Sequence, residues 1–351
     1  MKQVAIQLTG PLSKKVNTTI DWETLDKDHL LRIRIKDLKL KITGSSLEPM
    51  IDQLYEELAA KHLCFRPPHY LADEWLCPDK EPIIGIPFWL AHPRLKSIEI
   101  EKMYEAEGGN HKDCMKLLRH ECGHAINYAY KLYTRTRWRE LFGPFSTKYT
   151  DSYQYQPYSK RFVVHLDDHY AQSHPDEDFA ETFAVWLTPG NSWEKKYAKW
   201  PACKKLMYVD SLMKRIADRP PLVTAAPSPP WAAARMRSTL GAYYERKQNQ
   251  LGRDFKGYYD DGLKAIFTSN PQTDKYIKAA VILRRHKRLI VSYLATWSGH
   301  RKFDLYKLIN RIIARCNMLD LYGADDEKDL IAVTTLLTAI ACGTGRIQIL
   351  R

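Results

Sequence analysis

Residues 119–125 read Arg-His-Glu-Cys-Gly-His-Ala, and the stretch lies within a run of residues that is typical of a helix. Residues four apart share one face of a helix, so His120 and His124 would present two imidazole rings to one metal ion. Glu121 follows the first histidine, where its carboxylate would act on a water molecule rather than bind the metal. Two neutral nitrogen ligands, one further protein ligand and a position for water are typical of a catalytic zinc site. The pattern therefore predicts one zinc ion per chain.

The third ligand is expected from a later segment of the chain. A metzincin would continue with glycine and histidine at three and six positions after His124, and Asn127 and Tyr130 stand there instead. A second helix is predicted over residues 174–187. Proline and acidic residues fill its first turn, and Ser173 is suited to the N-cap position. This second helix is the expected source of the third ligand.

Two acids of this second helix are the candidate metal ligands. Glu177 and Glu181 are four residues apart and share a face, so one can bind zinc while the other holds the far nitrogen of a ligating histidine. We expect Glu177 to bind zinc and Glu181 to hold a histidine, and the reverse assignment is the competing interpretation. Tyr170 lies seven residues before Glu177, where its phenol would donate a hydrogen bond to a developing oxyanion. The alternative for Tyr170 is a half-buried tyrosine without a catalytic role.

These residues resemble the glutamate zincins, in which a His-Glu-x-x-His helix is followed by a helix that bears Glu-x-x-x-Asp or Glu-x-x-x-Glu. Residues 86–95, 118–125 and 170–184 are similar to a family of zinc-binding metallopeptidases found in bacterial genomes. The resemblance covers residues 30–215. It implies a zinc ion and a hydrolytic site, and it implies no particular substrate.

The expected fold class is α+β. We expect a zincin-like domain with a small sheet and an active-site helix, followed by a mostly α-helical C-terminal domain. The expected boundaries are an N-terminal tail over residues 1–29, the zincin-like metallopeptidase domain over 30–216, a proline-rich linker over 217–231 and a basic helical domain over 232–351. Five prolines between residues 217 and 231 disfavour a helix there and indicate the linker.

Positive charge is concentrated in the second part of the chain. Residues 1–200 carry 28 basic and 28 acidic side chains, whereas residues 201–351 carry 26 and 13. Such an excess permits binding to nucleic acid or to an acidic protein. No helix-turn-helix, RNA-binding or zinc-finger signature supports that interpretation, so a solvated basic helical domain is favoured.

Cysteine usage and hydropathy predict where the protein works. The seven cysteines are odd in number and form no Cys-x-x-Cys pair, which indicates a reducing compartment. The N-terminus lacks the apolar core of a signal peptide, and no apolar run is long enough to cross a bilayer. We therefore expect a soluble cytoplasmic peptidase that acts on a peptide or protein. The sequence predicts no oligomeric state.

Hydrophobic periodicity predicts the remaining elements. Strands are expected where apolar residues alternate with others or form short runs, at 30–35, 38–42, 83–88 and 97–100. The resemblance to zincins makes the edge of one of the last two a candidate to pair with an extended peptide substrate, and plain sheet structure is the alternative interpretation. Helices are expected where the period is close to 3.6, at 47–63, 111–133, 193–216, 232–250, 257–268, 273–297, 303–318 and 325–341.

Overall fold

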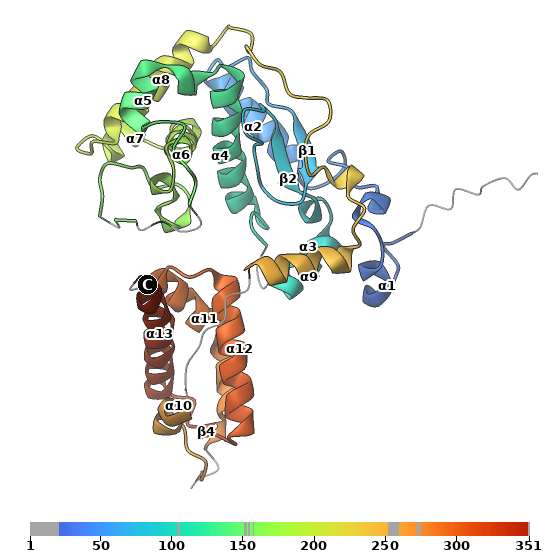
Figure 1. Ribbon diagram of the computed structural model, residues 1–351, viewed down its shortest axis with the longest axis vertical. Helices are drawn as coiled ribbons and strands as arrows, with labels where there is room; N and C mark the ends of the chain where they lie inside the picture. The colour runs from blue at the N-terminus through green and yellow to red at the C-terminus, as the bar shows by residue number, and fades with distance from the viewer. Residues whose placement is uncertain are drawn as a thin grey trace, which may run out of the picture.

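The computed structural model describes residues 21–103, 106–150, 153, 155–156, 158–251, 260–271 and 275–349. Figure 1 shows helices around a short two-stranded sheet in the N-terminal part, and a group of helices in the C-terminal part. The predicted α+β fold class is confirmed. Within the described residues, no helix combines the length and the apolar character needed to cross a membrane.

The N-terminal part contains most of the elements. Its α-helices are α1 (Lys27–Leu31), α2 (Glu48–Ala60), α3 (Pro93–Met103), α4 (His111–Ala129), α5 (Thr136–Phe142), α6 (Pro175–Leu187), α7 (Trp193–Lys196), α8 (Cys203–Ile216) and α9 (Leu240–Leu251). Its 3₁₀ turns are η1 (Ile35–Leu38), η2 (Phe88–Ala91), η3 (Leu132–Thr134), η4 (Asp167–Gln172) and η5 (Ala233–Arg235). Its strands are β1 (His69–Ala72) and β2 (Ile84–Pro87), which pair in parallel with Tyr70 opposite Gly85.

The strand β2 confirms the strand predicted at 83–88. At the middle of β2, however, both edges of the strand already pair with other segments of the chain. Gly85 pairs with β1 on one side, and on the other side it exchanges backbone hydrogen bonds of 2.8 and 3.3 Å with Leu76. The second candidate for a peptide-binding edge, residues 97–100, belongs to the helix α3. The prediction of a peptide-binding strand edge is therefore wrong for residues 97–100, and for β2 it stays a prediction.

Three predicted strands do not form: residues 97–100 lie in α3, residues 30–35 pass from the end of α1 through a turn to η1, and residues 39–42 lie in neither a helix nor a strand. Residues 30–35 and 38–42 overlap α1 and η1, and the Asp26 side chain caps α1 by accepting a hydrogen bond from the backbone N–H of His29. In α3 the buried Leu95, Ile98 and Met103 follow helical spacing, whereas Ile100 is exposed. Apolar residues that alternate with other residues over only four to six positions fit a strand and also a short helix with one buried face. The pattern therefore could not distinguish the two.

The helices α4 and α6 form the centre of the N-terminal part. Asn110 begins α4 by accepting a hydrogen bond from the backbone N–H of Asp113 at 3.0 Å. His174, rather than the predicted Ser173, caps α6, because its Nδ1 accepts from the backbone N–H of Asp176 at 3.1 Å. Every residue of α6 from Asp176 to Leu187 is buried, as expected of a helix surrounded by other elements.

The two helices touch at Gly123 of α4 and Ala180 of α6. A Cβ atom built on Gly123 would lie 2.8 Å from the Cα of Ala180 and 3.0 Å from its carbonyl oxygen. Only glycine allows so close an approach of the two backbones. The residues on either side of this contact, His120, His124, Glu177 and Glu181, therefore lie between the two helices.

The buried side chains form two clusters. The first draws on residues from Trp22 to Tyr244 together with Phe303, and the second on residues from Leu263 to Ala341. In the predicted linker, the backbone N–H groups of Leu222 and Val223 donate to the carbonyl oxygen of Ala129 at 2.8 and 3.0 Å. The proline-rich segment thus runs along the N-terminal part.

These clusters suggest other domain limits than those expected from the sequence. Residues 1–20 of the predicted tail lie outside the described residues, but Trp22 is 7% exposed and its Nε1 donates to the carbonyl oxygen of Leu38. The helix α9, which follows the proline-rich segment, contributes Leu240, Tyr243 and Tyr244 to the first cluster. We therefore propose that the N-terminal domain extends from about residue 21 through α9.

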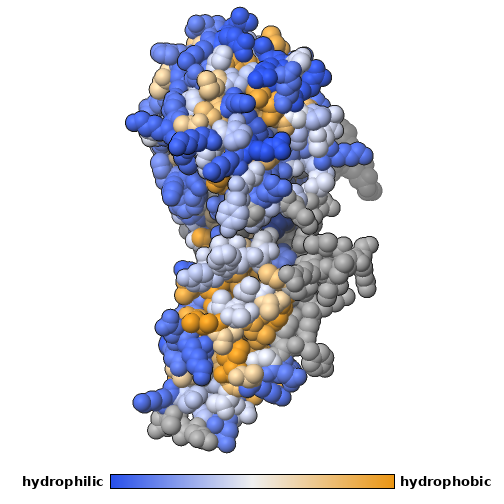
Figure 2. Space-filling view, turned by 90° about the vertical axis from the view of Figure 1, so that its left-hand side faces the viewer, coloured by the Kyte–Doolittle hydropathy of each residue, from blue (hydrophilic) through white to orange (hydrophobic). Residues whose placement is uncertain are grey.

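The C-terminal part is built on three long helices. The elements are α10 (Asp260–Ile266), β3 (Ile277–Lys278), α11 (Ala279–Ser298), α12 (Lys302–Met318), β4 (Tyr322–Gly323) and α13 (Glu327–Ile349), and α11 packs against both α12 and α13. The strands β3 and β4 form a two-residue antiparallel pair. Figure 2 shows apolar side chains on one face of this part. The large apolar side chains that are exposed on its helices include Leu289, Tyr293, Trp297 and Ile331.

Candidate metal centre

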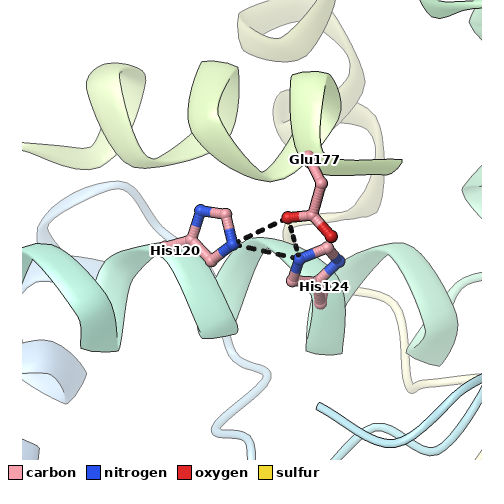
Figure 3. Close-up of side chains that lie close together, drawn as sticks. All are labelled: His120, His124 and Glu177. Atoms are coloured by element: carbon pink, nitrogen blue, oxygen red, sulfur yellow. Dashed lines mark hydrogen bonds and ion pairs between the residues drawn. The ribbon is translucent and has the colours of Figure 1, made fainter. Parts of the chain in front are cut away.

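The helix α4 presents His120 and His124 on the face that meets α6. Their side chains are buried, with 3% and 6% exposed, and their Nε2 atoms lie 3.1 Å apart. In Figure 3 dashed lines join these two nitrogen atoms to each other and to the side chain of Glu177. The predicted helical spacing of the two histidines is therefore present, and it brings two nitrogen atoms to one point between the helices.

Glu177 of α6 completes a group of three potential ligands. Its Oε2 lies 3.0 Å from Nε2 of His120 and 3.1 Å from Nε2 of His124. In Figure 3 dashed lines run from this one oxygen to both rings. Bonds of zinc to nitrogen and oxygen are ~2.0–2.2 Å long, so two ligand atoms at corners of a tetrahedron lie about 3.3 Å apart. The three side chains are thus spaced as one face of such a tetrahedron.

The second nitrogen of each histidine is held by a carboxylate of α6. Oε1 of Glu181 lies 2.9 Å from Nδ1 of His120, and Oδ2 of Asp176 lies 3.0 Å from Nδ1 of His124. A carboxylate only accepts hydrogen bonds, so each Nδ1 carries a hydrogen, and Nε2 is the nitrogen of each ring that is left to bind a metal. This arrangement orients histidine ligands and increases their basicity. The residues fit a zinc ion, and among the described residues they are the group of His, Cys, Asp and Glu side chains arranged to hold a metal.

Further residues fix these two carboxylates. The side-chain amide of Asn127 donates to Oδ1 of Asp176 at 2.7 Å, and the hydroxyl of Tyr128 donates to Oδ2 at 2.5 Å. The backbone N–H of Leu166 donates to Oε2 of Glu181 at 2.9 Å. Asp176 and Glu181 are at most 1% exposed, so these contacts satisfy charges that would otherwise be costly to bury.

Glu121 lies on α4 beside the histidines and keeps one oxygen without a partner. The residue is 6% exposed, and its Oε2 is buried with no hydrogen bond to the described residues. Burial raises the pKa of Glu121 to about 7 against the opposing charges of His120 and His124. A carboxylate with a pKa near neutrality is suited to accept and return a proton.

The pKa of each of the three potential ligands is shifted by its neighbours in the direction that favours the charged form. Burial lowers the pKa of His120, but its hydrogen bonds to Glu177 and Glu181 outweigh burial and raise that pKa to about 10. For His124, burial is likewise outweighed by Asp176 and Glu177, and the pKa is raised well above its usual value. The pKa of Glu177 is held well below its usual value, because the two histidines outweigh the effect of burial.

Two tyrosines flank the group. The ring of Tyr170 lies 5.6 Å from the ring of His120 between centroids, and burial raises its pKa above the usual range. Tyr149, which the sequence analysis did not single out, donates from its hydroxyl to Oε1 of Glu177 at 2.8 Å. It comes from the connection between α5 and η4, in which no periodic pattern or motif marks one tyrosine among several.

Sequence reasoning also missed the role of Asp176, which it placed only among the acids of a first helical turn. The neighbouring His165 and His174 are engaged elsewhere, because their Nε2 atoms lie 3.0 and 2.7 Å from the carbonyl oxygens of Lys116 and Thr147. Cys122 is fully buried in the first cluster, as expected of a packing residue. The structure therefore brings together every site residue predicted from the sequence, and it adds Asp176 and Tyr149.

The chain was compared with protein families, curated proteins and solved structures. No curated protein and no solved structure gives a significant match. The resemblance expected from the sequence is confirmed for one segment that contains both α4 and α6. Residues 98–203 match the model of the family described as putative zinc-binding metallo-peptidase.

Proposed function

We propose that this protein is a zinc-dependent peptidase that holds one zinc ion per chain through His120, His124 and Glu177. The observation that carries the proposal is the convergence of these three buried donors beside Glu121, whose Oε2 has no partner among the described residues. A purely structural zinc site closes its shell with four protein ligands, whereas three ligands beside a free carboxylate are typical of a catalytic site. The family match over residues 98–203 supports the same conclusion.

Each residue of the site has a distinct role in the proposed hydrolysis. A bound zinc ion supplies Lewis acidity and lowers the pKa of water to ~7. Glu121 takes a proton from the attacking water and later gives it to the leaving amine. Tyr170 donates a hydrogen bond to the oxygen of the scissile carbonyl as negative charge develops there. Glu181 and Asp176 keep both imidazoles in the tautomer that leaves Nε2 unprotonated.

Zinc content and peptide cleavage test the proposal with three variants. Glu177→Ala should lose most of the zinc, whereas Glu121→Gln should keep one zinc per chain and lose cleavage of a peptide library read by mass spectrometry. Glu140→Gln is the matched control, because Glu140 is exposed on α5 and forms an ion pair with the likewise exposed Arg137. Full cleavage by Glu121→Gln would refute the mechanism, and equal zinc in Glu177→Ala would refute the ligand set.

The alternative function, a zinc-containing protein whose basic helical part binds nucleic acid or an acidic partner, has less support. Several basic side chains of that part already pair with acids within it, namely Arg285 with Asp325 and Arg315 with Asp260. Binding of the full chain to duplex DNA at increasing salt measures this alternative. Affinity that falls steeply with salt would favour it, whereas no binding at low salt would exclude nucleic acid as the partner.

A further inference from the structure

The loop that follows α5 carries Tyr149, which connects this loop to the candidate metal centre. The hydroxyl of Tyr149 donates to Oε1 of Glu177 at 2.8 Å, while Oε2 of the same carboxylate faces the two histidines. Figure 3 shows how the two oxygens of Glu177 point in different directions. With Oε1 engaged by the phenol, Glu177 is oriented to offer a single oxygen to a metal.

The same loop makes three further contacts with the start of α6. The ring of Tyr149 stacks on the ring of His174, with centroids 3.8 Å apart and an angle of 13° between the planes. Nδ1 of His174 accepts the hydrogen bond that caps α6, so Nε2 carries the hydrogen and donates to the carbonyl oxygen of Thr147 at 2.7 Å. At the start of the loop, Gly143 adopts a positive φ of 114° and lies against Pro175. The loop from Gly143 to Tyr149 thus contacts the residues that position Glu177.

Tyr149 differs from the other residues that hold the potential ligands. Glu181 and Asp176, which hold His120 and His124, are buried residues of α6. Tyr149 is 59% exposed and lies on a loop. An exposed side chain on a loop can leave its partner without disrupting the packed helices, whereas Glu181 and Asp176 cannot.

We propose that Tyr149 is a positioning residue that fixes Glu177 as a one-oxygen ligand and controls how long the metal is retained. The inference rests on the proposed function only in requiring that Glu177 binds zinc, and it needs no peptidase activity. When Tyr149 is in place, Oε1 of Glu177 is occupied and the carboxylate cannot rotate away from the histidines. When Tyr149 moves away, the carboxylate is free to rotate and the metal leaves more readily.

The release of zinc to an excess of a coloured chelator measures this role directly. Loss of a residue that orients a metal ligand typically weakens metal binding 10–100-fold, so Tyr149→Phe should release zinc roughly tenfold faster than wild type. Tyr149→Ala should release it at least as fast, because it also loses the stacking on His174. The control is Tyr158→Phe, a change of the same kind at a tyrosine that is 94% exposed in the same connection, and it should behave as wild type.

Two further readouts separate positioning from a general structural effect. The thermal midpoint of the metal-free protein should be the same for wild type and Tyr149→Phe, since the phenylalanine keeps the stacked ring. The visible spectrum of the cobalt-substituted protein should change in Tyr149→Phe, because that spectrum reports the geometry of the ligands. A lowered midpoint of the metal-free variant, with an unchanged spectrum, would assign Tyr149 a structural role and overturn the inference.

The outcomes distinguish this inference from the proposed function. If Glu177→Ala loses zinc while Tyr149→Phe releases it at the wild-type rate, the ligand set stands and the inference fails. If Tyr149→Phe cleaves peptides more slowly with an unchanged rate of zinc release, Tyr149 acts on the substrate and the inference also fails. If Glu177→Ala retains zinc as wild type does, the ligand set itself fails, and with it the reason for a role of Tyr149.

Discussion

Replacing Gly123 with alanine tests whether the contact between α4 and α6 sets the geometry of the metal centre. A Cβ atom at this position would lie 2.8 Å from the Cα of Ala180, whereas ordinary contacts of a Cβ atom are 3.4–4 Å. The atoms that it meets belong to the backbone of α6 and cannot rotate away. The two helices must therefore separate by about 1 Å at this point to restore normal contact.

The expected magnitude follows from two opposing effects on stability. Alanine is a better helix former than glycine by ~1 kcal/mol, but overpacking a well-packed contact costs ~1–3 kcal/mol. The free energy of unfolding should therefore fall by about 1 kcal/mol. The effect on zinc should be larger, because functional sites tolerate displacements of only about 0.5 Å. A shift of Glu177 away from the two histidines should weaken zinc binding by about tenfold or more.

Urea unfolding of the metal-free protein and zinc titration against a competing chelator measure the two effects separately. The double variant Gly123→Ala with Ala180→Gly is informative, because it removes the side chain of Ala180 but leaves the backbone atoms that the new Cβ meets. It should therefore show no recovery of zinc affinity. A Gly123→Ala variant that is more stable than wild type and binds zinc with unchanged affinity would show that the helices do not touch at this point.

Three other predictions test the remaining physical arguments. Burial holds the pKa of His69 at about 4 in the folded chain, so the unfolded chain binds the proton first as the pH falls below ~6.5. Between pH 7 and pH 4, wild type should therefore lose about 3 kcal/mol more unfolding free energy than His69→Gln in urea titrations, and parallel curves would contradict this. Lys205→Met leaves Asp178 buried without its cation and should cost ~3–5 kcal/mol, whereas Lys205→Met combined with Asp178→Leu should recover most of it. Asp176→Ala removes the acceptor at Nδ1 of His124 and should weaken zinc binding ~10–100-fold in chelator competition, and an unchanged affinity would remove Asp176 from the site.

The sequence predicted the candidate site better than the surrounding fold, for a physical reason. The pairs His120 with His124 and Glu177 with Glu181 are each separated by one helical turn, and this local spacing holds in any well-formed helix. The match over residues 98–203 covers the same two helices. Tyr149 has no such local signal, because its contact with Glu177 depends on how a loop folds back on α6.

The errors in the fold have a related origin. Residues 97–100 contain two isoleucines in alternation, but Ile98 is buried and Ile100 is exposed, as a helix with one buried face requires. Four residues are too few to distinguish the two periods. That the proline-rich segment separates two domains stays a prediction; in the structure its backbone donates hydrogen bonds to Ala129, and its prolines only exclude a helix. The composition of residues 217–231 predicted that they form no helix. It carried no information on which part of the chain they pack against.

The antiparallel alignment of α4 and α6 supports the choice between the two glutamates that the sequence left open. His120 lies opposite Glu181, and His124 lies opposite Glu177, so the chain runs in opposite directions along the two helices. Glu177 reaches Nε2 of both histidines, at 3.0 and 3.1 Å. Glu181 lies one turn further along α6, beyond His120, and its side chain meets that ring from the Nδ1 side. Exchanging the two roles would require α6 to slide along α4 by one turn, ~5.4 Å, which the close contact of the helix backbones opposes.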